Sequence, residues 1–298
     1  MLTLNIIGCG NLGRTLARLW HQQQQFQIRD LVTASPASAS RACEFIGAGR
    51  PRSDLTAMAA ADCWLLATPD DAIAATAARL AESGLVSANS IVFHCSGSLA
   101  SDTLAPLAGS TAHLASIHPV HTFAVPAESV TRFAGTYCAY EGEPVALAGL
   151  LPAFKGIGAE LIAIEAATKI HYHAASVMAC NYLVALLDAS LECYANAGID
   201  AATASKMLLP IVHQTVDNSL LQSPQRALTG PIARADGNTV ERQLQALTGK
   251  SELLANLYRQ LGLQTLQVAR RRTSASPQLD KIEQLLRAPA PAYSNKPG

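Results

Sequence analysis

A glycine-rich turn near the start of the chain has the residue types that hold a dinucleotide. The sequence GCGNLG at positions 8–13 follows the apolar run Leu2–Ile7 and precedes a helical pattern, the context that such a site requires. Gly8 permits a tight turn, Gly10 lets a pyrophosphate approach the backbone, and Gly13 lets helix and strand pack closely. An ordinary glycine-rich turn is the alternative. The residues expected to contact the cofactor are Gly8, Gly10, Asn11, Leu12 and Gly13.

The end of the second expected strand, Ile28–Val32, favours NADP over NAD. NAD enzymes place Asp or Glu about 20 residues beyond the last glycine, where this chain has Thr33. Asp30 lies inside the strand, so we expect a structural role for it. Hydroxyl and guanidinium groups nearby could receive a 2′-phosphate, although the guanidinium could also be a solvated helix charge. These candidates are Ser35, Ser38 and Arg41.

Two further strand ends are expected near the nicotinamide end of the cofactor. Cys63–Thr68 is closed by Pro69, and the strand at 91–94 is closed by a Ser-Gly-Ser turn. Ligands of doubly wound sheets bind at the carboxyl ends of strands, although simple strand-to-helix turns explain the same residues. The candidates are Thr68, Ser96 and Gly97.

A lysine at the start of a long apolar helix could supply a proton. Lys169 and His173 are four residues apart and share one helix face. A partly buried lysine at a cofactor cleft can protonate a carbonyl oxygen as hydride arrives, and Asn181 could orient the substrate. The alternative is a lysine that extends to solvent at a helix start, with Asn181 as a hydrogen-bonded core amide.

Metal binding is not expected. His118 and His121 form an HxxH pair, but no HExxH sequence or cysteine cluster accompanies it. His171 and His173 are two apart on a helix and point to different sides. His118 or His121 is therefore expected to be a polar residue that lines the cleft.

Composition excludes several classes of protein. The chain has 298 residues, of which 49% are hydrophobic and 15% charged, so it can bury a large core. Lys+Arg and Asp+Glu are both 22, which argues against nucleic-acid binding. No uninterrupted apolar stretch suggests a membrane span, and no secretory signal is visible. The seven cysteines are dispersed, which favours buried thiols over a disulfide framework or a zinc site. We therefore expect a cytoplasmic protein.

The order of expected elements predicts an α/β protein with two domains. In residues 1–165 strands alternate with helices, which indicates a doubly wound, Rossmann-like parallel sheet. Residues 166–287 are expected to form an all-helical substrate and dimerisation domain. One helix is expected over 166–197, a loop over 221–238, a helix N-cap at Asp200, and a last helix that starts at Ser276-Pro277. The tail 288–298 is expected to be disordered.

Five motifs together resemble a known family. In chain order they are GCGNLG (8–13), HCSG (94–97), SIHPVHTF (116–123), KIHYHAASVMACNYLVAL (169–186) and ALTGPIARADGNTVERQL (227–244). They resemble bacterial proteins with a Rossmann-like N-terminal domain and a helical C-terminal domain of unknown function. The resemblance extends to about residue 272.

That family is similar to a larger group with ketopantoate reductase, 6-phosphogluconate dehydrogenase and related 3-hydroxyacid dehydrogenases. The resemblance implies that a Lys-x-x-x-Asn sequence on the first long helix of the second domain carries catalysis. Lys169 matches the lysine, His173 stands where the asparagine would be, and Asn181 could replace that amide. It also implies ketopantoate as the first candidate substrate and a dimer built on the long helix. Arg234 could then bind a substrate carboxylate, or pair with Asp236 to shape its loop.

The resulting hypothesis is an NADP-dependent oxidoreductase that reduces a small 2-keto acid. Lys169 would protonate the carbonyl oxygen, His173 and Asn181 would orient the substrate, and Arg234 or His118 would meet its carboxylate. The alternatives are a reductase of another acceptor, such as an imine or a deazaflavin coenzyme, and a non-catalytic NADP-binding regulator.

Overall fold

The computed structural model describes residues 1–272 and 276–288, and its two compact units divide between Tyr182 and Leu183. The last strand ends at Ala163, close to the expected domain boundary at 165. The first compact unit continues to Tyr182 because the first helical turns after the sheet pack on its strands. Of the expected tail 288–298, only Ala288 lies within the described residues.

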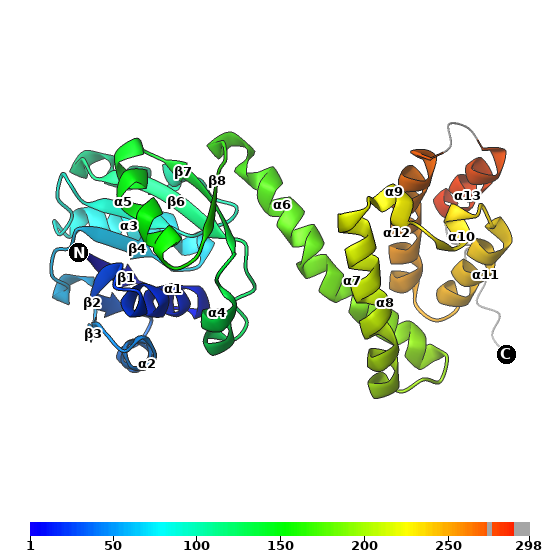
Figure 1. Ribbon diagram of the computed structural model, residues 1–298, viewed down its shortest axis with the longest axis horizontal. Coiled ribbons are helices and arrows are strands. Elements are labelled where there is room, and N and C mark those ends of the chain that lie inside the picture. The colour runs from blue at the N-terminus through cyan, green and yellow to red at the C-terminus, as the bar shows by residue number, and fades with distance from the viewer. Residues whose placement is uncertain (273–275, 289–298) are drawn as a thin grey trace, which may run out of the picture. The chain divides into compact units, whose positions relative to one another are not determined.

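The first unit is built on one eight-stranded sheet with the order β3-β2-β1-β4-β5-β6-β7-β8 (Figure 1). Its strands are β1 (Leu2–Ile7), β2 (Phe26–Val32), β3 (Arg50–Pro51), β4 (Cys63–Leu66), β5 (Ile91–His94), β6 (His113–Pro119), β7 (Tyr137–Gly142) and β8 (Glu160–Ala163). The expected α/β fold with a Rossmann-like sheet is confirmed. The sheet is not wholly parallel, because β6 and β7 pair antiparallel.

The reversal at β7 has a local cause. The segment after β6 forms α4 (Pro126–Arg132), which packs against α1 (Asn11–Gln22) and does not cross to the other edge of the sheet. The chain therefore re-enters the sheet beside the end of β6, where the N–H of Val120 donates to the Tyr137 carbonyl at 2.8 Å.

Helices cover both faces of the sheet. The α-helices are α1, α2 (Pro36–Ile46), α3 (Asp70–Glu82), α4 and α5 (Pro144–Gly156). Short 3₁₀ segments lie at Leu55–Ala57, Ser101–Ser110 and Ala166–Thr168. Helix α6 (Lys169–Ala179) follows the last of them. Trp20 of α1 packs edge-on against Phe154 of α5 and against Phe26 and Phe93 of the sheet, with ring centroids 5.2–6.2 Å apart. Burying each such side chain contributes roughly 1.5–3 kcal/mol, which holds the strand register that positions the site.

Asp30 is structural, as expected. Its carboxylate is fully buried in β2 and accepts from Arg50 Nε at 3.1 Å, Arg52 Nε at 3.0 Å and the Ala59 N–H at 2.8 Å. These bonds attach β3 and the following loop to β2, so the contacts of the Asp30 carboxylate stabilise the fold.

The second unit is helical. Its helices are α7 (Asn181–Asn196, which begins in the first unit), α8 (Ala201–Leu221), α9 (Pro224–Ala227), α10 (Gly230–Ala233), α11 (Gly237–Thr248), α12 (Glu252–Arg270) and α13 (Pro277–Arg287). Asp200 caps α8 and Ser276 caps α13, as predicted. A core that includes Ile232, Val240 and Leu266 joins the last helices.

Two expectations for this region are corrected. The single helix expected over 166–197 is divided into the 3₁₀ segment Ala166–Thr168, α6 and α7, and Cys180, with φ −109° and ψ −66°, separates the two α-helices. The loop expected over 221–238 contains α9 and α10, since Ser223 caps the first and a proline occupies the first turn of each.

One helical stretch among the described residues, Ala166–Asn196, is long and apolar enough to cross a membrane by length and composition. Its most apolar window of 18 residues has a mean hydropathy of 1.5 and is not buried. The stretch also carries Asn181, Asp188 and Glu192, which are polar or charged.

Candidate active site

Four parallel strands end at one edge of the sheet and place their next residues in a row. The paired residues are Ile7–Leu66, Leu66–His94 and His94–Ser116. Two residues farther along each strand lie Cys9, Thr68, Ser96 and His118. Neighbouring strands are about 4.8 Å apart, so this row leads stepwise from the glycine turn to a histidine.

The glycine turn has the geometry that its sequence predicts. Gly8 has φ +78°, and a Cβ there would lie 2.7 Å from the Ala67 carbonyl oxygen. A Cβ on Gly13 would lie 3.1 Å from Ala67 Cβ, which is the close helix–strand contact expected. A Cβ on Gly10 would meet nothing within 4 Å, so the space beside its backbone is open.

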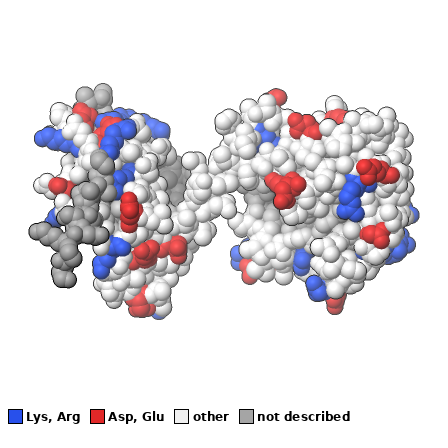
Figure 2. Space-filling view, turned by 180° about the vertical axis from the view of Figure 1, so that it is seen from behind, with Lys and Arg blue, Asp and Glu red and all other residues white. Residues whose placement is uncertain are grey.

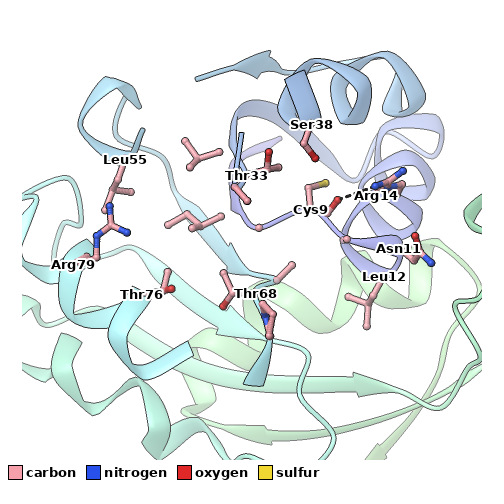
Figure 3. Close-up of a pocket in the computed structure, with 18 residues that line it drawn as sticks. Cys9, Asn11, Leu12, Arg14, Thr33, Ser38, Leu55, Thr68, Thr76 and Arg79 are labelled. Carbon is pink, nitrogen blue, oxygen red and sulfur yellow. Dashed lines mark hydrogen bonds between the residues drawn. The ribbon is translucent and has the colours of Figure 1, made fainter. Parts of the chain in front are cut away.

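The open space belongs to a cavity of about 620 Å³ (Figure 3). It lies between the glycine turn, the end of β2, the end of β4 and the face of α3. Gly10 precedes α1, and no side chain caps that helix, so its first N–H groups remain able to bind an anion. The cavity therefore fits the pyrophosphate and one nucleoside of a dinucleotide.

Two buried polar atoms on the cavity wall have no partner among the described residues. They are Arg14 Nε and Thr68 Oγ1. A buried polar group without a hydrogen bond is costly, so such atoms commonly await a ligand or water. Figure 3 places Arg14 on the same side as Ser38 and Cys9, with Thr68 at the base of the cavity. Arg14 directly follows the GxGxxG sequence, and this was the available signal for it.

The other residues expected near the 2′-phosphate divide into two groups. Ser38, with Thr33, lines the cavity. Ser35 is exposed, and its hydroxyl caps α2 by accepting from the Ser38 N–H at 3.3 Å. Arg41 is exposed on α2, and neither Ser35 nor Arg41 is among the described residues that line the cavity.

Beyond β5, two histidines converge on Gly97. A Cβ built on Gly97 would lie 2.4 Å from His173 Nδ1 and 2.8 Å from His118 Nε2. The two rings are edge-to-face with centroids 5.7 Å apart. His173 Nδ1 is buried and has no hydrogen-bond partner among the described residues. His118 Nδ1 lies 2.8 Å from the Tyr172 hydroxyl, a residue that the sequence reasoning did not select.

Lys169 has a different environment from that expected of an exposed or cleft-facing amine. Its side chain is 1% exposed, and Nζ donates to Ser116 Oγ and, at 3.1 Å, to Glu141 Oε1. Burial lowers the pKa of Lys169, while the Glu141 carboxylate opposes that shift. The ion pair attaches the first turn of α6 to β6 and β7. Its role as proton donor stays a prediction.

A third histidine, His94, is fully buried and continues the hydrogen bonds of Lys169 and Ser116. His94 Nδ1 accepts from the Ser96 N–H at 3.1 Å and lies 3.3 Å from Ser116 Oγ, so Nε2 carries the proton and donates to the Ala100 carbonyl at 3.1 Å. Burial lowers the pKa of His94 to about 4, so the ring is neutral at pH 7. Hydrogen bonds thus run from Glu141 through Lys169 and Ser116 to this ring.

Three further candidates have different surroundings. The Ser96 hydroxyl lies at the expected edge but donates to Asp70 Oδ2 at 2.7 Å. Asn181 is exposed at the start of α7. Arg234 is exposed in the second unit, where Asp236 caps α11. The roles of these residues stay predictions. No group of three or more possible metal ligands occurs within residues 1–272 and 276–288.

Comparison with known protein families now identifies both parts of the chain. A model of a Rossmann-like domain matches residues 1–119, and a domain of unknown function, DUF2520, matches residues 136–265. The chain joins a Rossmann-like domain to a DUF2520 domain. This confirms the pairing that the five motifs indicated. No curated protein matches the sequence.

Solved structures share the fold over almost their whole length. A candidate NADP oxidoreductase from Bacteroides fragilis has 20% identity and a TM-score of 0.73, covering 91% of this chain and 98% of that chain. A protein from Thermotoga maritima has 24% identity and a TM-score of 0.69, with 91% and 99% covered. Plasmodium falciparum pyrroline carboxylate reductase with NADP bound has 12% identity and a TM-score of 0.57, with 95% and 98% covered. At these identities the likeness establishes the fold.

Proposed function

We propose that this protein is an NADP-dependent oxidoreductase that reduces a C=O or C=N bond in a small organic acid. The observation that carries the proposal is the row of strand ends. It starts at the open backbone of Gly10, passes the unpartnered hydroxyl of Thr68 and ends at the histidines over Gly97. A dinucleotide cavity next to unpaired polar groups is the arrangement that a nicotinamide-dependent reductase needs.

The glycine turn would hold the pyrophosphate, and Thr68 would bind near the nicotinamide end. Arg14 on α1 and Ser38 on α2 line the cavity together with the end of β2. They support NADP over NAD, because a guanidinium and a hydroxyl suit a 2′-phosphate better than a ribose diol. NADPH would supply the hydride. Asp30 cannot hold a ribose diol, since Arg50 and Arg52 occupy its carboxylate.

Ketopantoate is the first candidate substrate, on the strength of the motif resemblance. A cyclic imine acid is the second, because a pyrroline carboxylate reductase with NADP bound has the same fold over 95% of this chain. Both are small acids with a reducible carbon–heteroatom double bond.

The test is NADPH consumption by purified protein with ketopantoate and, separately, pyrroline carboxylate. We expect loss of NADPH absorbance with one of them, and a Gly10→Val protein should show little loss at an NADPH concentration that just saturates the wild-type protein. Tight NADPH binding without consumption of either acid would instead support the non-catalytic regulator.

We also propose that two copies of the chain associate through α7 and α8. Helix α8 exposes Met207, Leu209, Ile211, Leu220 and Leu221, and an apolar groove of about 620 Å³ lies between α7 and α8. Large exposed apolar patches mark interaction surfaces. Light scattering should give the mass of a dimer, and Leu209→Glu should give a monomer. Leu253→Glu is the matched control, because Leu253 is 81% exposed on α12.

Surface charge and cysteines support the remaining expectations. On the described part of the face in Figure 2, Lys and Arg are interspersed with Asp and Glu, as suits a protein that does not bind nucleic acid. All seven cysteines are free thiols, which supports a cytoplasmic location.

A further inference from the structure

Two imidazole nitrogens border the space beside Gly97 and make no hydrogen bond within the part of the chain that the structure describes. His173 Nδ1 is buried without a partner, and the structure gives His118 Nε2 no hydrogen bond within residues 1–272 and 276–288. Both nitrogens lie within 2.8 Å of the position that a Cβ on Gly97 would occupy. Only glycine leaves this position free, so the arrangement keeps both nitrogens available to a ligand.

The proton on His118 can be assigned from its surroundings. Burial lowers the pKa of His118 to about 4, with smaller contributions in the same direction from the neighbouring His173 and Lys169, while Asp70 opposes the shift. The ring is therefore neutral at pH 7 and carries one proton. Burial raises the pKa of Tyr172 to about 12, so its phenol keeps its proton and can donate it to His118 Nδ1, 2.8 Å away. We assign this direction to the hydrogen bond because it leaves the imidazole proton for the ligand side of the ring. The single imidazole proton then lies on Nε2, on the side of Gly97.

We propose that Tyr172 and His118 form a proton relay that protonates the substrate heteroatom during reduction, with His173 Nδ1 as a second contact for the substrate. This inference rests on the proposed function and deepens it. As hydride adds to the carbon of the C=O or C=N bond, the π electron pair moves to the heteroatom. That atom takes the proton from His118 Nε2, and His118 Nδ1 takes the phenol proton of Tyr172. After the product leaves, water returns a proton to His118 Nε2, and the proton on His118 Nδ1 passes back to the Tyr172 phenolate, which restores the starting tautomer.

The energetics favour this direction. An alkoxide is a much stronger base than a phenolate, so passing the phenol proton to it through a neutral imidazole runs downhill. His118 and Tyr172 are each only half-buried, which allows water to return the proton to this pair. Lys169 is then a positioning residue, because its buried ion pair with Glu141 anchors the first turn of α6, the turn that carries Tyr172 and His173.

The relay is tested by turnover and by a spectroscopic readout that needs no substrate. Tyr172→Phe and His118→Asn should each lower kcat about 100-fold or more, within the range of general acid catalysis, and NADPH affinity by fluorescence should change less than threefold. The double variant should be no slower than His118→Asn alone, because the two residues act as one unit. His171→Asn is the matched control, since His171 neighbours Tyr172 but is exposed.

Nitrogen-15 NMR of the full-length protein supplies the second readout. It should show His118 as the neutral Nε2–H tautomer at pH 7, with an Nδ1 shift that changes in Tyr172→Phe. A Tyr172→Phe protein with wild-type kcat, or a His118 ring protonated on Nδ1, would overturn the relay. A wild-type protein that keeps the Nε2–H tautomer but consumes no NADPH with ketopantoate or pyrroline carboxylate would overturn the proposed function and with it the catalytic use of the pair.

Discussion

The cofactor cavity and the histidine pair are built in different ways, although both lie at the carboxyl edge of one sheet. The cavity takes its central contacts from one short segment, residues 8–13, and uses backbone groups. The histidine pair brings together Gly97, His118 and His173 from three distant segments and uses side chains. A ligand site made of contiguous backbone is visible in a sequence motif, whereas one made of distant side chains appears only when strand register is known.

Lys169 and His173 show the same contrast within one helix. They are four residues apart on α6 and were expected to act together at the cleft. The structure pairs Lys169 with Glu141 inside the protein and leaves His173 Nδ1 unpaired over Gly97. Equal helical spacing therefore says little about which of two polar groups meets a ligand.

The largest effect expected is on stability, from breaking the ion pair beneath the histidines. Lys169→Met leaves the buried Glu141 carboxylate without its counter-charge, although it still accepts hydrogen bonds from the Ser101 N–H and hydroxyl. The free energy of unfolding should fall by about 3–5 kcal/mol. Denaturant titration followed by tryptophan fluorescence reports on the first unit alone, because Trp20 and Trp64 both lie there. The Lys169→Met/Glu141→Leu double variant should recover most of the loss. A single variant as stable as wild type would show that the pair does not anchor α6.

On the cofactor side, Gly10→Val should weaken NADPH binding about 100-fold, because the side chain fills space that the pyrophosphate needs. Nothing lies within 4 Å of a Cβ at Gly10, so the variant should fold and melt normally. Gly109→Ala is the matched control, since a Cβ there also meets nothing within 4 Å. Unchanged NADPH affinity in Gly10→Val would remove the glycine turn from the cofactor site.

Gly97→Ala should separate the two regions. The added methyl group displaces the histidines, so kcat should fall about 10-fold or more. NADPH affinity should change less than threefold, because the glycine turn is untouched. Steady-state kinetics beside a fluorescence titration measure both quantities. Equal losses in kcat and affinity would mean that the two regions do not have separate roles.

The smallest effect concerns the choice between NADP and NAD. A charged hydrogen bond is worth about 1.5–3 kcal/mol, so Arg14→Gln should lower the ratio of kcat/KM for NADPH over NADH about 10-fold. Arg41→Gln tests the guanidinium that the sequence first suggested. A larger fall of this ratio in Arg41→Gln than in Arg14→Gln would show that Arg41, and not Arg14, contacts the 2′-phosphate.

How well the sequence predicts a feature depends on how far apart in the chain the contacting residues lie. The glycine turn and the caps at Asp200 and Ser276 depend on short segments, and the structure agrees with each. The structural role of Asp30 follows from its position inside a strand, although its partners Arg50 and Arg52 lie 20 and 22 residues away in the chain. The antiparallel strand β7 depends on how α4 packs against α1. The burial of Lys169 and the contact of Tyr172 with His118 depend on the register of β5, β6 and β7. These long-range contacts have no signature in residue spacing.

The central claim is that the cofactor cavity and the histidine pair are two ends of one active site. A crystal structure of the protein with NADPH tests it most directly. We predict the pyrophosphate against Gly10, the 2′-phosphate beside Arg14 and Ser38, and the nicotinamide ring between Thr68 and Gly97, within reach of His118. A nicotinamide ring directed away from Gly97, or NADPH bound outside the glycine turn, would contradict the claim.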